Sequence, residues 1–200
     1  MPEYHIRTPI SEKEVRDLRV GDIVYISGVI VTARDSAHRR MLEYYSQNKP
    51  MPVDLRGGVV YHCGPVVSKK DEEWIVIAAG PTTSARMEIY EADVIEKFGV
   101  RAIIGKGGMG SRTARACKEY GAVYLVFTGG AAILAAKAIK KVRDVKWLDL
   151  GIPEALWVFE VENFGPLLVV IDSTGRNLIE EVINNARRAR DELIKALGVS

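Results

Sequence analysis

The chain has 200 residues and a mass of 22.1 kDa, and its 48% hydrophobic and 27% charged residues are typical of a globular protein with a substantial core. Its 28 basic and 26 acidic side chains give a formal net charge of +2, so no overall field attracts nucleic acid or a membrane, and any anion site must be built locally. The first residues do not resemble a signal peptide, and no apolar run approaches the roughly 20 residues of a membrane-spanning helix, so we expect one domain, residues 1–200, in the cytoplasm.

The first half of the sequence predicts strands and one helix. Residues 22–31 are rich in β-branched and aromatic side chains, which favours a strand. Ala33, Ala37, Met41 and Tyr44 recur at a helical period, which predicts a helix over residues 33–47 that ends before Pro50 and Pro52. Two short buried strands are expected over residues 58–62 and 73–79.

The second half alternates between helix and strand. Helices are expected over residues 86–98, 113–120 and 131–142, and strands over residues 100–104 and 122–127. Two further strands, 157–161 and 167–171, are separated by a predicted turn at 163–166, and a charged surface helix follows over residues 178–197. This alternation predicts a layered α/β domain with some parallel strands.

Three basic residues stand where a helix disfavours them. Arg34 and Arg86 lie at predicted helix starts, and Lys106 lies in a loop between a strand and a helix. The positive end of a helix dipole repels cations, at a cost of about 0.3–1 kcal/mol each. Free backbone N–H groups, the dipole and the basic side chains all favour an anion, so the pattern indicates an anion-binding site for a compact dicarboxylate.

Each of these residues also has a purely structural interpretation. Thr32 and Asp35 fit a capping box, Thr82, Thr83 and Ser84 are candidate helix caps, and a single arginine is often a solvated surface residue. The sequence allows two interpretations of His38, a plain surface histidine and a functional one. It leaves the role of Cys63 open. Cys117 lies between small residues in a predicted helix and is expected in the core.

The segment Gly105–Gly110 offers an alternative function. It matches the G-x-G-x-x-G pattern between a strand and a helix, which is the context of a dinucleotide-binding loop. The acidic residue expected after the next strand is missing, and Lys106 is followed by Gly107 rather than the Ser or Thr of a P-loop. A nucleotide-binding α/β enzyme is therefore the second interpretation, and a non-catalytic scaffold domain the third.

Five ordered segments resemble motifs of one family, the β subunits of class I fumarase and L-tartrate dehydratase. The family stretches are TARDxAH, Y-x-G-P (here with one extra residue), GPTTSxRM, IGKGGM and EAxW. They correspond to Thr32–Arg39, Tyr61–Pro65, Gly80–Met87, Ile104–Met109 and Gly151–Trp157. The flanking sequence also fits, so the resemblance covers nearly the whole chain.

The resemblance implies a three-layer swivelling β/β/α domain with a mixed sheet, and a hydro-lyase that reversibly hydrates a small dicarboxylate. Fumarate to malate is the first expectation and dehydration of L-tartrate the second. By position in the motifs, Arg34, Arg86 and Lys106 would hold substrate carboxylates, and Thr82, with Thr83 beside it, would transfer or align a proton.

The family reaction also implies a [4Fe–4S] cluster whose open iron acts as a Lewis acid. Such a cluster needs three cysteine ligands, whereas this chain has Cys63 and Cys117 alone. We therefore expect that the cluster belongs to a partner α subunit and that this chain binds no cofactor. The expected assembly is a hetero-oligomer with its active site at the subunit interface. Without its partner, this chain should be inactive and is open to forming a homodimer.

Overall fold

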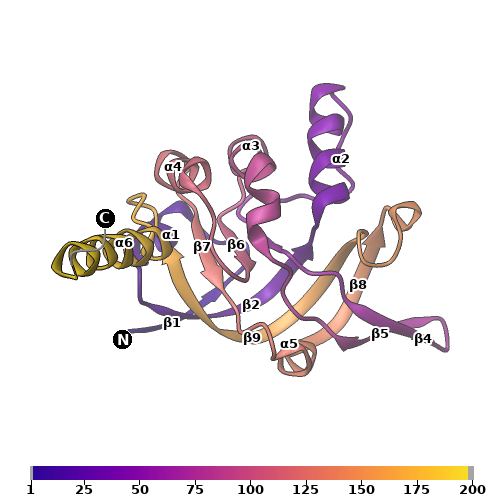
Figure 1. The fold of residues 1–200 in the computed structure, drawn as a ribbon. Helices are drawn as coiled ribbons and strands as arrows, with labels where there is room; N and C mark the ends of the chain where they lie inside the picture. Colours follow the sequence, from indigo (N-terminus) through magenta and orange to yellow (C-terminus); the bar gives the residue numbers. More distant parts are fainter. Residues whose placement is uncertain (1, 198–200) are drawn as a thin grey trace.

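The computed structural model describes residues 2–197 and contains two groups of strands and a set of helices (Figure 1). The strands are β1 (Glu3–Arg7), β2 (Ile23–Thr32), β3 (Val59–Tyr61), β4 (Val66–Lys70), β5 (Glu73–Ala78), β6 (Ala102–Gly105), β7 (Val123–Val126), β8 (Ile139–Lys146) and β9 (Leu156–Ile171). The helices are α1 (Glu12–Asp17), α2 (Asp35–Ser46), α3 (Glu88–Phe98), α4 (Ser111–Tyr120), α5 (Ala132–Ala138) and α6 (Leu178–Ala196), with 3₁₀ turns η1 (Ser84–Met87) and η2 (Leu148–Leu150).

Seven strands form one mixed sheet in the order β1-β2-β3-β6-β7-β9-β8, and β4 pairs with β5 in a separate hairpin. Neighbours from β1 to β7 run parallel, whereas β9 runs antiparallel to β2, β7 and β8. Because β9 pairs with both β7 and β2, the hydrogen-bonded strands close into a ring. The predicted α/β class with a mixed sheet is confirmed; the three-layer arrangement stays a prediction.

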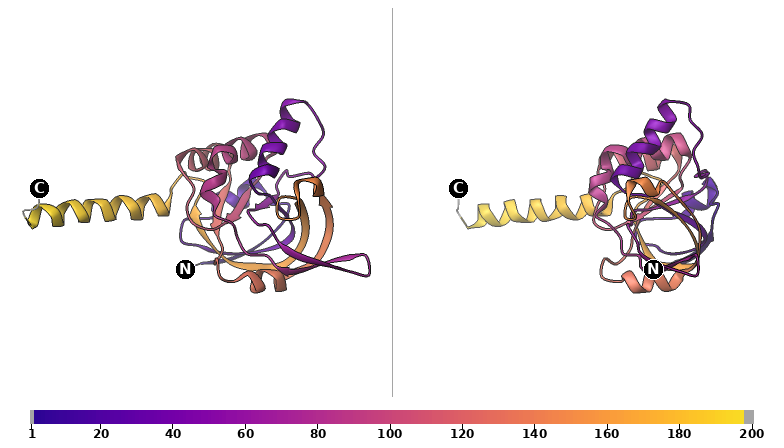
Figure 2. Two further views of the ribbon diagram at one scale, coloured as in Figure 1. Left: turned by 45° about the vertical axis from the view of Figure 1, so that its right-hand side comes forward. Right: turned by 90° about the vertical axis from the view of Figure 1, so that its right-hand side faces the viewer.

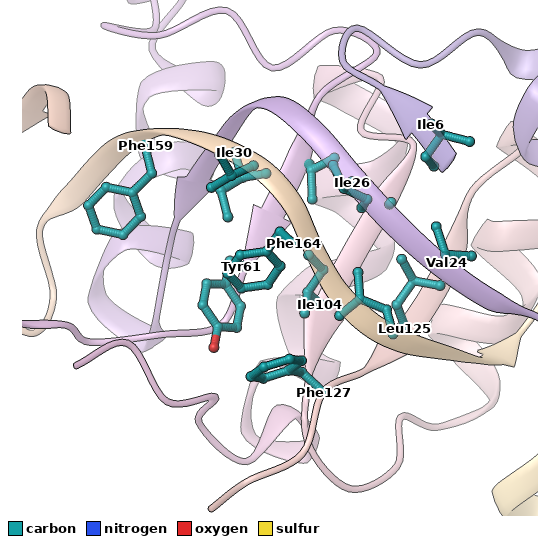
Figure 3. Close-up of a cluster of buried hydrophobic side chains, with 14 of the residues drawn as sticks. Ile6, Val24, Ile26, Ile30, Tyr61, Ile104, Leu125, Phe127, Phe159 and Phe164 are labelled. Atoms are coloured by element: carbon teal, nitrogen blue, oxygen red, sulfur yellow. The ribbon is translucent and has the colours of Figure 1, made fainter. Parts of the chain in front are cut away.

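The parallel strands are buried on both faces. In β6, Ala102 and Ile104 face one hydrophobic cluster while Ile103 between them faces another. The first cluster fills the inside of the ring with aromatic and branched side chains, as Figure 3 shows for Tyr61, Phe127, Phe159 and Phe164 among others. Side chains alternate along a strand, so strands covered on both sides need apolar residues at every position.

The second cluster lies between the sheet and the helices α2, α3 and α4, which line up on the same side of it (Figure 1). Ala37 and Met41, predicted to share a helix face, are both fully buried there. By contrast, α6 extends away from the body of the molecule (Figure 2), and none of its residues within Leu178–Ala196 is buried. This agrees with the surface helix predicted over residues 178–197.

Two predicted elements are wrong. The helix expected over residues 131–142 ends at Ala138, and the chain continues as β8, because Ile139–Lys146 pairs with β9 and this tertiary pairing overrides a local helical pattern. The turn expected at 163–166 does not form. Phe164 and Leu167 pair with Ile26 and Val24 of β2, so one 16-residue strand passes through the segment with register shifts in place of a turn.

Short elements were missed altogether: β1, α1 and β4 were not predicted. The remaining predicted boundaries agree to within a few residues. Among residues 2–197, no helix is both long and apolar enough to span a membrane.

Candidate anion-binding site at the carboxyl edge of the sheet

The predicted site residues follow the ends of neighbouring parallel strands. Arg34 comes two residues after β2, and Lys106 comes directly after β6. Between them lies β3, where the N–H of Ala33 donates to Tyr61 O (3.0 Å) and the N–H of His62 donates to Ile104 O (2.8 Å). Carboxyl ends of parallel strands share one edge of a sheet, which is where open α/β folds commonly bind ligands.

The loop with Thr82 and Thr83 is attached to the same edge by backbone hydrogen bonds. The Thr82 N–H donates to His62 O (2.6 Å), the Lys106 N–H to Thr82 O (3.3 Å) and the Ser84 N–H to Lys106 O (3.1 Å). The loop thus lies beside Lys106 as a short parallel bridge. Thr82 is half-buried and Thr83 is exposed.

Arg86 lies in η1, one turn beyond Thr82, and contacts the start of α2. Its guanidinium donates from Nε (3.1 Å) and Nη2 to the two carboxylate oxygens of Asp35. The hydrogen bond from Arg86 lowers the pKa of Asp35, which keeps that carboxyl ionised. Arg86 is 48% exposed, so its outer side remains open to a ligand.

Arg34 is the N-cap residue of α2 and is more enclosed than Arg86. Its Nε lies 3.3 Å from Glu154 Oε1, and its side chain is 22% exposed. The guanidinium passes over Gly64, where a Cβ atom would come within 2.7 Å of Nη1. Within residues 2–197 the Nε atom has no hydrogen-bond partner of good geometry.

The structure therefore brings the five predicted residues, from three separate segments, to one edge of the sheet. Arg34, Thr82 and Lys106 are half-buried, and Thr83 and Arg86 are exposed, so this chain presents an open surface. The hollow lined by residues 72–76 and 139–145 includes none of the five. Two acidic side chains lie beside the predicted site: Asp35 pairs with Arg86, and Glu154 pairs with Arg34.

Three structural interpretations from the sequence are corrected. Thr32 does not cap α2, because its hydroxyl donates to Ala155 O (3.3 Å) and accepts from the N–H of Trp157 (3.0 Å), and Arg34 is the N-cap. Thr83 precedes η1 without a side-chain cap, so Arg86 lies in a 3₁₀ turn rather than in the first turn of a long helix. His38 is fully buried, so its interpretation as a surface histidine is wrong.

Behind the site lies a buried acidic residue that the sequence analysis missed. Glu91 Oε2 is 2.8 Å from His62 Nε2 and 3.2 Å from His38 Nε2, and all three side chains are inaccessible to solvent. Burial opposes ionisation of Glu91, but the two imidazoles outweigh it and lower its pKa to about 2. A sequence signal existed: Glu91 shares the buried face of α3 with Val94 and Ile95, where an acidic residue is unexpected.

Protein groups occupy both ends of the glycine-rich loop. A Cβ atom at Gly105 would lie 1.8 Å from Ser84 Oγ, and one at Gly110 would lie 2.6 Å from Glu88 Oε1. The Glu88 carboxylate accepts hydrogen bonds at the N-terminus of α4 from Gly110 N (2.7 Å), Arg112 N (3.1 Å) and Thr113 Oγ1 (2.7 Å). A nucleotide phosphate would need that same helix end, so the geometry argues against the nucleotide alternative.

The two cysteines do not fit an iron–sulfur cluster. Cys63 belongs to the core inside the ring and Cys117 to the core beneath the helices, so they lie on opposite faces of the sheet. Burial raises the pKa of Cys63 to about 12 and raises that of Cys117 as well, which disfavours the thiolates that iron requires. The prediction that Cys117 is a core residue is confirmed.

Fold and site together define a mixed α/β domain that presents basic and hydroxyl side chains at the carboxyl edge of its parallel strands. The sequence profile of the family described as Fumarase C-terminus matches residues 3–182, and the chain belongs to this family.

Named relatives cover almost the whole chain. L(+)-tartrate dehydratase subunit beta of Escherichia coli (strain K12) is 42% identical over 192 residues, which are 96% of this chain and 94% of the relative. A putative L(+)-tartrate dehydratase subunit beta of Methanocaldococcus jannaschii is 45% identical over 186 residues, 92% of this chain and 95% of the relative. A putative fumarate hydratase class I of Geobacillus stearothermophilus is 47% identical over 178 residues, 88% of this chain but 34% of the relative.

Proposed function

We propose that this chain is the β subunit of a hydro-lyase that reversibly adds water to a small unsaturated dicarboxylate. The observation that carries the proposal is the convergence of Arg34, Thr82, Thr83, Arg86 and Lys106 on one edge of the sheet. In the proposal, Arg34, Arg86 and Lys106 hold the two carboxylates, and Thr82, supported by Thr83, transfers or aligns the proton next to one of them.

The arrangement suits proton abstraction beside a carboxylate. Removing that proton places further negative charge on a group that is already anionic, so fixed cations stabilise the charge as it develops. A threonine hydroxyl is a weak base in water and needs a desolvated, cation-rich setting. Thr82 is half-buried and its carbonyl accepts the N–H of Lys106, which supports Thr82 over the exposed Thr83.

The proposed assembly places the [4Fe–4S] cluster on an α subunit. The open surface of the site and the two buried, protonated thiols of this chain support that division. The subunit names of the tartrate dehydratase relatives support a second chain. In the Geobacillus relative the region matched by this chain makes up 34% of the length, which leaves room for the cluster-binding part in the same polypeptide.

For the substrate we propose fumarate and malate first and L-tartrate second. All are compact dicarboxylates that suit three cations, and they differ in their hydroxyl groups. L-tartrate is retained because two relatives that align over most of this chain carry that name.

The test is anaerobic co-expression with a candidate α subunit from the same organism, followed by assays with fumarate, malate and L-tartrate. We expect water addition or removal by the two-subunit preparation, and a colourless, iron-free, inactive preparation of this chain alone. Iron and hydratase activity in the isolated chain would refute the division of labour. An iron-loaded but inactive complex with all three substrates would refute the proposed reaction.

A further inference from the structure

A continuous chain of buried polar groups runs beneath the proposed site. His38 Nδ1 lies 2.8 Å from Arg34 O, and His38 Nε2 lies 3.2 Å from Glu91 Oε2. The same carboxylate oxygen lies 2.8 Å from His62 Nε2, and His62 Nδ1 lies 2.8 Å from Ser84 Oγ. This series of contacts joins α2, α3, the end of β3 and η1. The groups at its two ends, Arg34 O and Ser84 Oγ, belong to the two segments that carry the predicted arginines.

The neighbours of each nitrogen determine where the protons lie. Arg34 O can only accept a hydrogen bond, so His38 carries a proton on Nδ1. Its Nε2 lies 3.2 Å from the ionised Glu91 without a hydrogen bond of good geometry among residues 2–197. A proton on Nε2 replaces the repulsion between its lone pair and the carboxylate by attraction, so we assign His38 as an imidazolium. His62 donates from Nε2 to Glu91, and its Nδ1 then accepts the proton of the Ser84 hydroxyl. The positive charge of His38 balances the negative charge of Glu91, because a charge that is fully buried needs a partner of opposite sign.

We infer that His38, Glu91, His62 and Ser84 form a neutral, buried positioning network that fixes Arg34 relative to the Thr82–Arg86 loop. None of the four is proposed to touch substrate. The purpose of the network, which is to position carboxylate-binding residues, rests on the proposed function. The contacts that form the network do not depend on it.

The surrounding groups support this distribution of charge. Burial lowers the pKa of His38, but attraction to Glu91 outweighs it and the net shift is upward. For His62 burial prevails and the pKa is lowered, with the neighbouring His38 acting in the same direction. Cys117 of α4 and Tyr124 of β7 also face Glu91, and burial raises the pKa of both, so they remain neutral. Asp35, at the rim, adds attraction to both histidines.

The loop is also fixed by shape. Ser84 Oγ occupies the space above Gly105, where any side chain would collide with it, and the Ser84 N–H donates to Lys106 O at 3.1 Å. A displacement of Ser84 therefore moves Lys106 and Thr82 with it. Two imidazoles and a carboxylate are also a possible metal-ligand set, with their ligand atoms within 4.8 Å of one another. Three of the four ring nitrogens hydrogen-bond to protein groups, whereas among residues 2–197 His38 Nε2 makes only the 3.2 Å ion-pair contact with Glu91. A metal would have to take His62 Nε2 from its hydrogen bond to Glu91, which favours the network over a metal site.

The experiment uses the full chain, uniformly labelled with ¹⁵N. The chain has three histidines, so the ring resonances of His38 and His62 can be assigned with His5 as the exposed reference. At pH 7 we expect His38 protonated on both nitrogens and His62 neutral with its proton on Nε2. A neutral His38 or a charged His62 would overturn the inference, as would stoichiometric binding of Zn²⁺ to the unmodified chain that is lost in His62→Asn.

The second measurement is hydrogen exchange of Glu91→Gln, which keeps the shape and removes the charge. Asp172→Asn is the matched control, because Asp172 is also a buried carboxylate and follows the end of β9 near the start of β7, at the opposite edge of the sheet. We expect the protection of the Thr82, Ser84 and Lys106 amides to fall at least tenfold in Glu91→Gln alone. Unchanged protection, or an equal loss in the control, would overturn the positioning role.

The third measurement links the network to activity in the two-subunit enzyme, where Glu91→Gln should lower kcat/KM at least tenfold and Asp172→Asn should not. Normal kinetics in Glu91→Gln would overturn the positioning role. The ring spectra and amide exchange need neither substrate nor partner, so the network can be confirmed even if the proposed reaction proves wrong. The ring spectra are recorded on the unmodified chain, so they test the network even if Glu91→Gln does not fold.

Discussion

Arg86 shows how much a single side chain depends on its shape at this site. Its planar guanidinium contacts both oxygens of Asp35, and the face left exposed could hold a substrate carboxylate in the same two-point manner. Lysine offers a single charged point on a flexible stem and cannot reproduce either contact.

In the two-subunit enzyme, Arg86→Lys should therefore lower kcat/KM by roughly ten- to hundredfold, about 1.4 kcal/mol per decade. The melting temperature should barely change, because exposed ion pairs contribute about 0–1 kcal/mol. Steady-state kinetics and thermal melting measure the two effects, with Arg112→Lys as the control on α4. Full activity of Arg86→Lys, or loss of activity through unfolding, would remove Arg86 from the site.

A second residue-scale prediction concerns Gly105. An added methyl group would meet the Ser84 hydroxyl at 1.8 Å in a buried place, so Gly105→Ala should destabilise the protein by about 1–3 kcal/mol. Gly130→Ala is the control, because nothing lies within 4 Å of its added Cβ. Urea denaturation of both variants checks this, and equal stability would show that the loop moves freely away from Gly105.

At the scale of elements, α6 stands apart from the rest of the fold. Within its described residues none is buried, and Val182, Ile183 and Leu193 are 57%, 44% and 63% exposed. Helical stability in proteins comes mainly from packing, which α6 lacks beyond its first turn.

Truncation after Val182 should consequently change the free energy of unfolding by less than about 1 kcal/mol, and the melting temperature by less than roughly 2–4 °C. The contrast is Asn177→Ala. Asn177 caps α6 by accepting the Glu180 N–H and also donates to Met109 O from a buried position, so its loss should cost about 1 kcal/mol or more. A large loss of stability on truncation would mean that α6 packs against another surface in solution.

The other element-scale prediction concerns the N-terminus of α4, where Glu88 occupies the place that a phosphate would take. Neither NAD nor ATP should bind the chain appreciably in calorimetry at micromolar concentrations. Glu88→Gln keeps much of the geometry without the charge and serves as a comparison. Saturable nucleotide binding by the unmodified chain would restore the nucleotide interpretation.

At the scale of the whole molecule, the buried network makes stability depend on pH. The pKa of Glu91 is about 2 in the folded chain against 4.5 when unperturbed, a difference of 4.5 − 2 = 2.5 units, or roughly 3 kcal/mol. A depressed carboxyl pKa stabilises the fold above pH 4.5, and this contribution is lost as the pH falls towards 2. The pKa of His38 is raised, so His38 stabilises the fold at pH values below its unfolded pKa of 6.5. The pKa of His62 is lowered, so His62 destabilises the fold in the same pH range.

The difference in unfolding free energy between the wild type and Glu91→Gln should therefore shrink by roughly 3 kcal/mol between pH 5 and pH 2. Urea denaturation across that range measures it, and Glu180→Gln, on the exposed face of α6, should follow the wild type throughout. A pH-independent difference between the wild type and Glu91→Gln would mean that Glu91 is not ionised in the fold.

Local pattern was sufficient for most elements, and it nominated the candidate site residues. The helical period of Ala37 and Met41, the apolar strands and the ordered motifs are properties of neighbouring residues, so the α/β class, the family and the five candidate positions could be predicted from the sequence. The pattern failed where pairing with a distant strand overrode it. Ile139–Lys146 forms a strand because it pairs with β9. Residues 163–166 stay within β9 because this segment pairs with β2.

Only the tertiary structure decided which groups lie beneath the site. His38, His62, Ser84 and Glu91 are separated by up to 53 positions in the chain (91 − 38), and no local spacing relates them. Their contact depends on how α2, α3 and η1 pack over β3, and their charges depend on complete removal from water. Sequence determined the side chains that the edge of the sheet can present to an anion, whereas packing determined what holds them there, because hydrogen bonding and desolvation act through space rather than along the chain.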